Sequence, residues 1–225
     1  MDLLVVNPNT TASMTETIDR AARRVARPGT RIVTVGSESG PPSIQGYLDG
    51  ALCLAGMLEQ VERHRGVDGV VIACFDDTGL DAVRCMVDAP VLGIGQSACY
   101  AARMLSNRFT VITTLSRSVP LLEANLQRYG MTSRIAAVRA TDIPVLELER
   151  MSSETMDTMR RVIEAAIRED RSDAIVLGCA GMTDLMQQLS KEFEMPVIDG
   201  LSCAVTMAEA LVASGLRTSK AGAYG

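Results

Sequence analysis

The sequence has little of several residue types on which common functional sites depend. It contains no tryptophan, only 3% aromatic residues and a single histidine, His64. A nucleic-acid-binding protein usually carries a basic face or stacking rings, whereas this chain has 22 basic and 27 acidic residues and a net charge of −5. One histidine and no Cys-x-x-Cys pair leave few ligands for a zinc ion, and His64 is expected at a helix end as a partner of the helix dipole. We therefore expect neither a nucleic-acid partner nor a metal.

Long apolar runs are also missing from the sequence. No stretch approaches the roughly 20 residues of a membrane helix, so no membrane partner is expected. The first residues, MDLLVVNPNT, lack the basic segment of a signal peptide and are typical of a strand. Without an export signal, the six cysteines are expected to be reduced thiols in a cytoplasmic protein. The composition, with 47% apolar and 22% charged residues, is that of an ordinary globular protein.

Short β-branched runs alternate with longer amphipathic stretches along the whole chain. This order predicts parallel strands joined by helical crossovers. Strands are expected at 2–6, 31–35, 69–74, 90–94, 109–113, 135–139, 173–178 and 195–199. Helices are expected near 11–25, 48–65, 79–87, 96–106, 117–129, 152–169, 183–193 and 201–213.

The order of these elements repeats in two halves. The segment SDAIVLGC, which ends at Cys179, is similar to VDGVVIAC, which ends at Cys74. Asn7 precedes Cys74 by 67 residues and Thr113 precedes Cys179 by 66, so two segments match at nearly the same offset of about 105 residues. A period this long indicates two similar domains and not a solenoid. Eight βα units fit either one (β/α)₈ barrel or a pair of four-stranded domains, and in both a ligand binds beyond the carboxyl ends of the strands.

Cys74 and Cys179 differ from the other cysteines in their sequence context. Each ends a predicted strand and precedes a glycine-containing turn into a helix, where backbone N–H groups favour a thiolate. Free cysteine is also a common small core residue, so from spacing alone both roles stay open. Two thiols on opposite sides of a cleft could invert a stereocentre, one removing a proton from carbon and the other returning one to the opposite face. The remaining cysteines are expected to be packing residues: Cys53, Cys85, Cys99 and Cys203.

Four segments spread over the chain carry a family resemblance: NPNTTASMT (7–15), GPPSIQGYLD (40–49), ACFDDTGLDAVR (73–84) and VLGCAGMTDL (176–185). Together they resemble the aspartate/glutamate/hydantoin racemase superfamily, and most closely its hydantoin racemase branch. The resemblance implies an α/β fold of two similar four-stranded parallel-sheet domains, related by a pseudo-two-fold axis, with the active site between them. It therefore favours two domains over the barrel. It also implies that the last helix returns to the first domain, which would comprise residues 1–97 and 206–225, with 98–205 as the second.

The resemblance also implies a reaction and a set of site residues. Cys74 and Cys179 become the catalytic pair of a cofactor-independent, homo-oligomeric racemase that transfers a proton at C5 of a 5-substituted hydantoin. Backbone amides at 75–77 and 180–182 would hold carbonyl oxygens. The loop 41–47 would cover the substrate side chain, with a plain surface turn as the alternative. The substrate-binding residues implied in this way are Asn7, Ser43, Ile44, Phe75, Asp76, Asp77, Thr113, Ala180 and Gly181.

The residues after the second cysteine bear on the choice of substrate. Relatives that act on free amino acids follow their cysteines with polar helper residues, whereas Ala180, Gly181 and Met182 offer no side-chain proton donor. This favours a substrate whose C–H is already activated, such as a hydantoin, whose C4 carbonyl turns the carbanion into an enolate. The alternatives in the superfamily are allantoin racemase, amino-acid racemase, malonate decarboxylase and maleate isomerase. Outside it, a small-molecule binding domain and a redox protein with a Cys74–Cys179 disulfide stay open.

Two acidic residues follow only the first cysteine. Asp76 and Asp77 come after Cys74, while nothing acidic follows Cys179 until Asp184. The favoured expectation is that they cap a helix and compensate its dipole. A carboxylate that faced Cys74 would instead raise the pKa of its thiol. In that case Cys74 would rest as the thiol and Cys179 as the thiolate.

Overall fold

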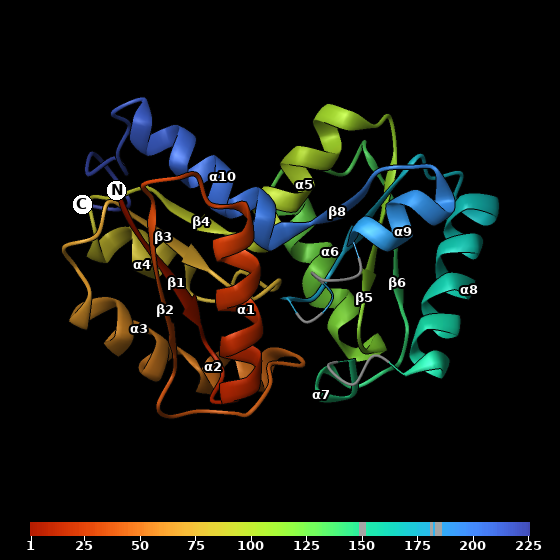
Figure 1. Cartoon of the computed structure of the whole chain (residues 1–225), viewed down its shortest axis with the longest axis horizontal. Coiled ribbons are helices and arrows are strands. Elements are labelled where there is room, and N and C mark those ends of the chain that lie inside the picture. Colours follow the sequence, from red (N-terminus) through yellow and green to blue (C-terminus); the bar gives the residue numbers. More distant parts are fainter. Residues whose placement is uncertain (149–151, 181, 183–185) are drawn as a thin grey trace.

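The computed structural model describes the whole chain except residues 149–151, 181 and 183–185. Two sheets, each of four parallel strands, lie side by side (Figure 1). The first has the order β2-β1-β3-β4 and the second the order β6-β5-β7-β8. Their strands are β1 (Asp2–Asn7), β2 (Arg31–Gly36), β3 (Gly69–Ile72), β4 (Val91–Gly93), β5 (Phe109–Thr113), β6 (Ile135–Ala140), β7 (Ala174–Leu177) and β8 (Val197–Asp199). All eight predicted strands are present, and the two-domain α/β architecture with a pseudo-two-fold arrangement is confirmed over the barrel.

Helices connect successive strands, as the alternating pattern predicts. They are α1 (Ala12–Val25), α2 (Tyr47–Leu52), α3 (Leu54–Arg63), α4 (Leu80–Met86), α5 (Ile94–Leu105), α6 (Val119–Arg128), α7 (Val145–Leu148), α8 (Ser153–Glu169), α9 (Met186–Phe193) and α10 (Gly200–Ala213), with a 3₁₀ turn η1 (Ser116–Ser118). The helix predicted at 48–65 is two helices divided at the buried Cys53, and the short α7 was not predicted. Within the described ranges, no helix is long and apolar enough to cross a membrane.

The repeat found in the sequence is also present in the strand register. The last paired residues are Val6 with Ile72 between β1 and β3, and Ile112 with Leu177 between β5 and β7. One residue further on, the Ala73 amide donates to the Val6 carbonyl and the Gly178 amide to the Ile112 carbonyl, both at 2.8 Å. Cys74 and Cys179 follow these two amides directly. The two sheets therefore deliver their thiols at equivalent points.

The helix that ends each half packs on the other half. Helix α5 follows β4 but contacts β7 and β8, while α10 follows β8 but contacts α1, β3 and β4 (Figure 1). The two helices also contact each other, where a Cβ on Gly200 would overlap the Ile94 carbonyl. Buried Glu209 anchors α10 by accepting hydrogen bonds from the Arg27 amide (2.8 Å) and the Thr30 hydroxyl (2.6 Å). The last helix thus returns to the first half, while the residue limits of the two domains stay a prediction.

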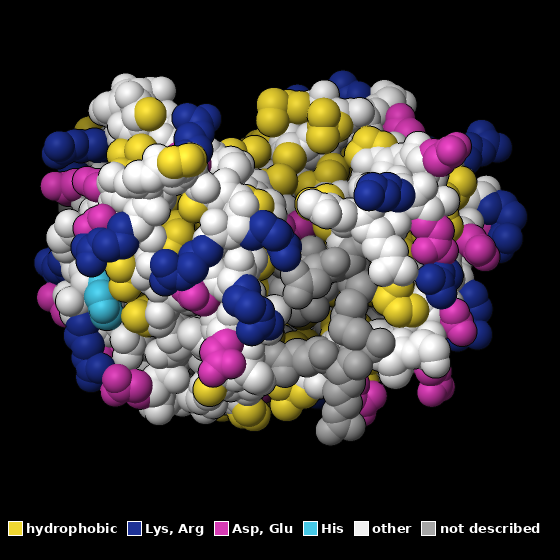
Figure 2. Space-filling view, viewed as in Figure 1, with side chains coloured by type: hydrophobic (Ala, Val, Ile, Leu, Met, Phe, Trp, Pro, Cys, Tyr) yellow, Lys and Arg dark blue, Asp and Glu magenta, His cyan; other side chains and the backbone are white. Residues whose placement is uncertain are grey.

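The outer face of α5 carries exposed apolar side chains. Tyr100, Met104 and Leu105 are 40%, 73% and 64% exposed, and apolar side chains gather over this helix in Figure 2. Elsewhere on the face shown, basic and acidic side chains are interspersed. The expected homo-oligomer stays a prediction.

The helices α5 and α10 begin at equivalent points but receive their N-terminal caps from different places. In α10 the cap is local: the Asp199 carboxylate accepts from the amides of Leu201 (3.1 Å) and Ser202 (2.9 Å). The equivalent residue before α5 is Gly93, which has no side chain but similar backbone angles, φ −92° and ψ 144° against −101° and 127° at Asp199. The first turn of α5 therefore needs an acceptor from elsewhere in the chain.

Asp77 supplies the missing cap of α5 from the turn after β3. Its carboxylate accepts from the Gly95 amide (3.0 Å), the Gln96 amide (2.6 Å) and the Tyr129 hydroxyl, just beyond α6 (2.6 Å). Asp77 has φ 51°, in the left-handed region that aspartate tolerates better than most residues. A Cβ at Gly93 would overlap this carboxylate, so the glycine makes room for it. The capping expectation is correct for Asp77, but the helix that it caps is α5 and not α4, which follows it directly.

Moving the cap of α5 from Asp77 to position 93 tests whether Asp77 replaces a local capping residue. Asp77→Ala removes three hydrogen bonds from a buried site and should lower the free energy of unfolding by about 2–4 kcal/mol. Gly93→Asp alone should also destabilise the protein, because its side chain would collide with the Asp77 carboxylate. The double variant should be more stable than Asp77→Ala, because the aspartate introduced at position 93 can then cap α5 as Asp199 caps α10. Urea unfolding followed by circular dichroism measures these differences.

The matched control is Asp199→Ala combined with Gly93→Asp. Here the new aspartate cannot replace the lost cap of α10, so the two losses should add. If the losses of stability also added in the double variant of Asp77→Ala and Gly93→Asp, an aspartate at position 93 would not replace the Asp77 cap, and this interpretation would be wrong.

Candidate active site

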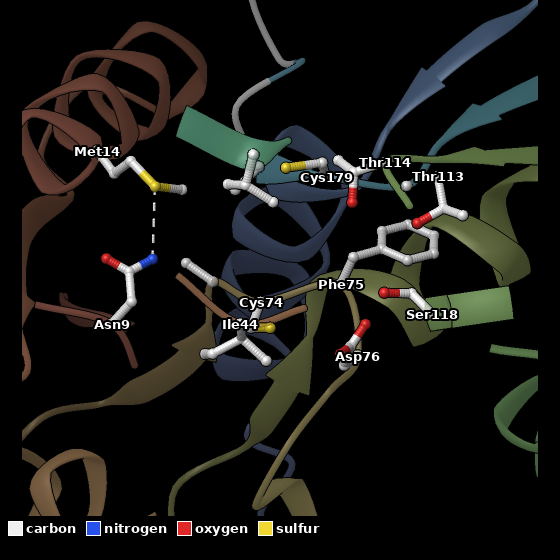
Figure 3. Close-up of a pocket in the computed structure, with 14 residues that line it drawn as sticks. Asn9, Met14, Ile44, Cys74, Phe75, Asp76, Thr113, Thr114, Ser118 and Cys179 are labelled. Atoms are coloured by element: carbon white, nitrogen blue, oxygen red, sulfur yellow. Dashed lines mark hydrogen bonds between the residues drawn. The ribbon is translucent and has the colours of Figure 1, made fainter. Parts of the chain in front are cut away.

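A pocket lies at the carboxyl ends of the strands and is lined by residues from both halves of the chain (Figure 3). Its lining consists of Asn9, Met14, Ile44, Ala73, Cys74, Phe75, Asp76, Thr113, Thr114, Ser118, Val145, Gly178, Cys179 and Ala180. Both cysteines of the repeat are included, and Figure 3 shows the Cys179 sulfur above the Cys74 sulfur near the middle of the view. Among the described lining residues, the titratable side chains are Cys74, Asp76 and Cys179. The pocket therefore holds two thiols and one carboxylic acid.

The two cysteines begin turns of the same form. The Asp77 amide donates to the Cys74 carbonyl and the Met182 amide donates to the Cys179 carbonyl, both at 3.0 Å. These two amides, expected to hold carbonyl oxygens of a ligand, are thus used inside the turns. The intervening Asp76 amide donates to the Cys74 sulfur, which favours the thiolate form.

The surroundings of Cys74 favour the protonated thiol in spite of that amide. Burial, and then the negative charge of Asp76, raise the pKa of the Cys74 thiol well above its ordinary value. Burial also raises the pKa of Asp76 to about 7, and its neighbours Asp77 and Asp49 act in the same direction. At Asp77 burial raises the pKa to about 6 even though Tyr129 and the two α5 amides favour its ionised form. The first half of the site is thus acidic, and Asp76 is the carboxylic acid that lines the pocket beside Cys74.

Asp76 is held in place through its backbone, while its side chain faces the pocket. The Asn125 amide group of α6 donates to the Asp76 carbonyl at 2.8 Å, which ties this turn to the second half. Oδ2 of Asp76 is buried and has no hydrogen-bond partner among the described residues. Asp76 and Asp77 are therefore adjacent in sequence but different in role, because only Asp77 has its carboxylate occupied by protein donors.

Several expected substrate-binding residues do line the pocket and others do not. Ile44, Phe75, Asp76, Thr113 and Ala180 are in the lining. Gly181 lies outside the described residues.

Asn7, Ser43 and Asp77 are not part of the lining, because each is used in contacts within the protein. The Asn7 amide group donates to Oδ1 of Asn9 (3.0 Å) and to the Thr15 hydroxyl (2.9 Å), and the Ser43 hydroxyl accepts from Gln45 (2.6 Å).

Other lining residues were not predicted. Asn9 of NPNT takes the position expected for Asn7, with Oδ1 accepting from the Thr11 amide (2.9 Å) and Nδ2 contacting the Met14 sulfur (3.5 Å, Figure 3). Thr114 and Ser118 lie one and five residues after Thr113, which the repeat places opposite Asn7 of the first half. No sequence pattern indicated Val145.

The loop before α2 connects the first half to the second across the pocket. The Pro42 carbonyl accepts from the Thr11 hydroxyl (2.7 Å), and Oε1 of Gln45 accepts from Arg117 at 3.3 Å. Ile44, between these anchors, lines the pocket. This agrees with a covering loop better than with a plain surface turn.

Comparison with known proteins places the chain in a family. A sequence profile of the Asp/Glu/Hydantoin racemase family matches residues 3–208. Hydantoin racemases from Rhizobium meliloti and Pseudomonas sp. (strain NS671) are 44% and 42% identical over the full chain, which covers 94% and 91% of their lengths. The solved structure of an allantoin racemase from Klebsiella pneumoniae is 48% identical and superposes with a TM-score of 0.96, over the full chain and 92% of that protein. The chain therefore belongs to the Asp/Glu/Hydantoin racemase family and is an isomerase of the racemase type.

Proposed function

We propose that this racemase inverts C5 of 5-substituted hydantoins by a two-base reaction in which Cys74 and Cys179 are the proton-transferring groups. The observation that carries the proposal is the pair of thiols at equivalent strand ends of the two sheets, facing one pocket. Inversion at carbon needs a base on one face and an acid on the other. The pseudo-symmetry of the fold supports this assignment, because each sheet contributes one of the two thiols to the pocket.

The structure of the substrate itself makes its C5–H bond more acidic. In a hydantoin the C5–H lies next to the C4 carbonyl, so that removal of the proton gives an enolate and not a localised carbanion. The hydroxyls of Thr113, Thr114 and Ser118 line the pocket and are donors for the negative oxygen that develops. No cofactor is needed for this step, since the ring itself delocalises the charge.

The two thiols differ in the charge that surrounds them. Asp76 and burial favour the protonated form of Cys74, whereas the turn after Cys179 offers Ala180 in the equivalent position to Phe75 and no described acid. We therefore propose that Cys74 is the thiol in the resting enzyme, which gives Cys179 the part of the base. In each turnover one sulfur takes the C5 proton as the other gives its own proton to the opposite face of the carbon. The two sulfurs thereby exchange protonation states, and the enzyme is ready for the other enantiomer.

Allantoin is the second candidate substrate, because it is a hydantoin with a ureido group at C5 and the same proton is exchanged. The similarity to the Klebsiella pneumoniae allantoin racemase supports it. The apolar lining residues Met14, Ile44 and Val145 favour apolar 5-substituents.

Substitution of either cysteine tests the two-base reaction. Cys74→Ala and Cys179→Ala should each lower the rate of racemisation of both enantiomers by at least about 100-fold, because one proton transfer loses its group. Each variant keeps one base and should still exchange the C5 proton of a single enantiomer for deuterium, without inversion. Polarimetry and proton NMR in D₂O measure the two effects.

The control is Cys203→Ala, which removes a partly buried thiol outside the pocket and should racemise at the wild-type rate. Full racemisation by either Cys74→Ala or Cys179→Ala would refute the two-base reaction.

A substrate panel tests the proposed specificity. We expect the optical rotation of 5-alkyl and 5-aryl hydantoins to decay to zero, with allantoin slower, and that of the matching free amino acids to stay constant. Equal rates on amino acids and hydantoins would contradict the need for an activated C–H.

The influence of Asp76 on the Cys74 thiol can be measured by alkylation. Because the Asp76 carboxylate raises the pKa of that thiol, Asp76→Asn should lower it and speed the reaction of Cys74 with iodoacetamide, followed by peptide mass spectrometry. The pKa of Asp76 is about 7, so the difference from wild type should be large above pH 7 and disappear as Asp76 becomes protonated at lower pH. An unchanged or slower reaction of Cys74 at pH 8 would show that the Asp76 charge does not control it.

A further inference from the structure

One buried acceptor in the pocket, a carboxylate oxygen of Asp76, lacks a hydrogen bond from the part of the chain that the structure describes. Oδ2 of Asp76 has none among the described residues, although buried polar atoms in folded proteins nearly always have one. The neighbouring Asp77 shows the ordinary situation, since its carboxylate accepts three hydrogen bonds from the protein. An unpaired acceptor in the lining of a pocket therefore indicates a group that a ligand must supply.

The charges around Asp76 define the chemistry of that group. The ionisable groups whose charges act on Asp76 are Asp77 and Asp49, both acidic, and its near neighbour Cys74 is a further acid. A ligand carboxylate at this point would meet negative charge in a buried setting, where repulsion is strong. A neutral N–H, in contrast, would satisfy the acceptor without adding charge.

The position of Asp76 within the pocket also fits a ring N–H. Its carbonyl is held by Asn125 and its amide by the Cys74 sulfur, so its backbone is fixed next to the reacting thiol. The hydroxyls of Thr113 and Ser118 line the same pocket as donors. One acceptor among several donors matches a ring in which N–H and C=O groups alternate.

We propose that Asp76 is the specificity-determining residue of this site: it accepts a hydrogen bond from a ring N–H of a cyclic ureide and rejects substrates that carry a carboxylate in place of the ring. This rests on the proposed function and extends it, because it identifies the neutral ring as the recognised group. It also gives a physical reason for excluding free amino acids from a site that has two suitable thiols.

The experiment combines changes in the protein with changes in the ring. Wild type, Asp76→Asn and Asp76→Ala are titrated by calorimetry with a 5-substituted hydantoin, its N1-methyl and N3-methyl derivatives, and the anionic ring-opened N-carbamoyl amino acid with the same side chain. The same proteins are assayed for racemisation of the parent ring, which separates changes in KM from changes in kcat.

In the wild type, methylation of the ring nitrogen that faces Asp76 should weaken binding at least tenfold. In Asp76→Ala the parent should bind as weakly as that methyl derivative, and methylation should add little, because the acceptor is already gone. Asp76→Asn keeps an acceptor but loses the charge, so the parent should bind within a few-fold of wild type and the N-carbamoyl anion about tenfold more tightly.

A control variant at the surface shows whether the effects are specific to Asp76 and not caused by any lost charge. Asp88→Asn removes an exposed carboxylate of the same half and should change none of these ratios. Equal methylation penalties in wild type and Asp76→Ala, or an unchanged affinity of Asp76→Asn for the anion, would overturn the inference. Because binding is measured directly, wild type that binds the parent ring selectively but does not racemise it would refute the proposed function and leave this recognition intact, whereas no binding of the ring would overturn both.

Discussion

The arrangement of the site depends on the carboxylate of Asp77. This one buried group caps α5, receives the Tyr129 hydroxyl at the end of α6 and belongs to the turn that carries Cys74. Because α5 packs on the second sheet and α6 belongs to the second half, a single side chain fixes the first thiol relative to the second domain. In the proposed two-base reaction both thiols must reach the same carbon, so their separation has to be fixed. The contacts of Asp77 would then matter for catalysis although Asp77 lies outside the pocket lining.

The two halves are equivalent in their strands and different in their electrostatics. The register places Cys74 and Cys179 at the same level of both sheets, yet Asp199 caps α10 locally while Asp77 caps α5 from a distance. This difference in capping explains why an acid at the position of Asp77 follows only the first cysteine. Because Asp77 is occupied by the cap, Asp76 is the one carboxylic acid of the described lining. The Cys74 side of the pocket therefore carries an acidic group that a symmetric duplication would not place on one side alone.

Burial makes this difference between the halves matter for the protonation of Cys74 and Asp76. Asp76 and Cys74 are both acids, and taking them out of water raises the pKa of each, since both are charged when ionised. Burying Oδ2 of Asp76 without a partner among the described residues costs free energy. In the proposed role, a ligand N–H would recover that free energy on binding.

The sequence by itself determined the alternation of strands and helices, the duplication and the two matched cysteines, because these depend on local periodicity and on spacing along the chain. Through the resemblance it also indicated five of the residues that line the pocket: Ile44, Phe75, Asp76, Thr113 and Ala180. Only the tertiary structure decided between barrel and paired sheets, replaced Asn7 by Asn9 in the lining, and assigned Asp77 to a helix that begins 17 residues later in the chain. The physical reason is that caps, burial and pocket walls are contacts between segments distant in sequence, and one hydrogen bond of this kind leaves no periodic pattern behind.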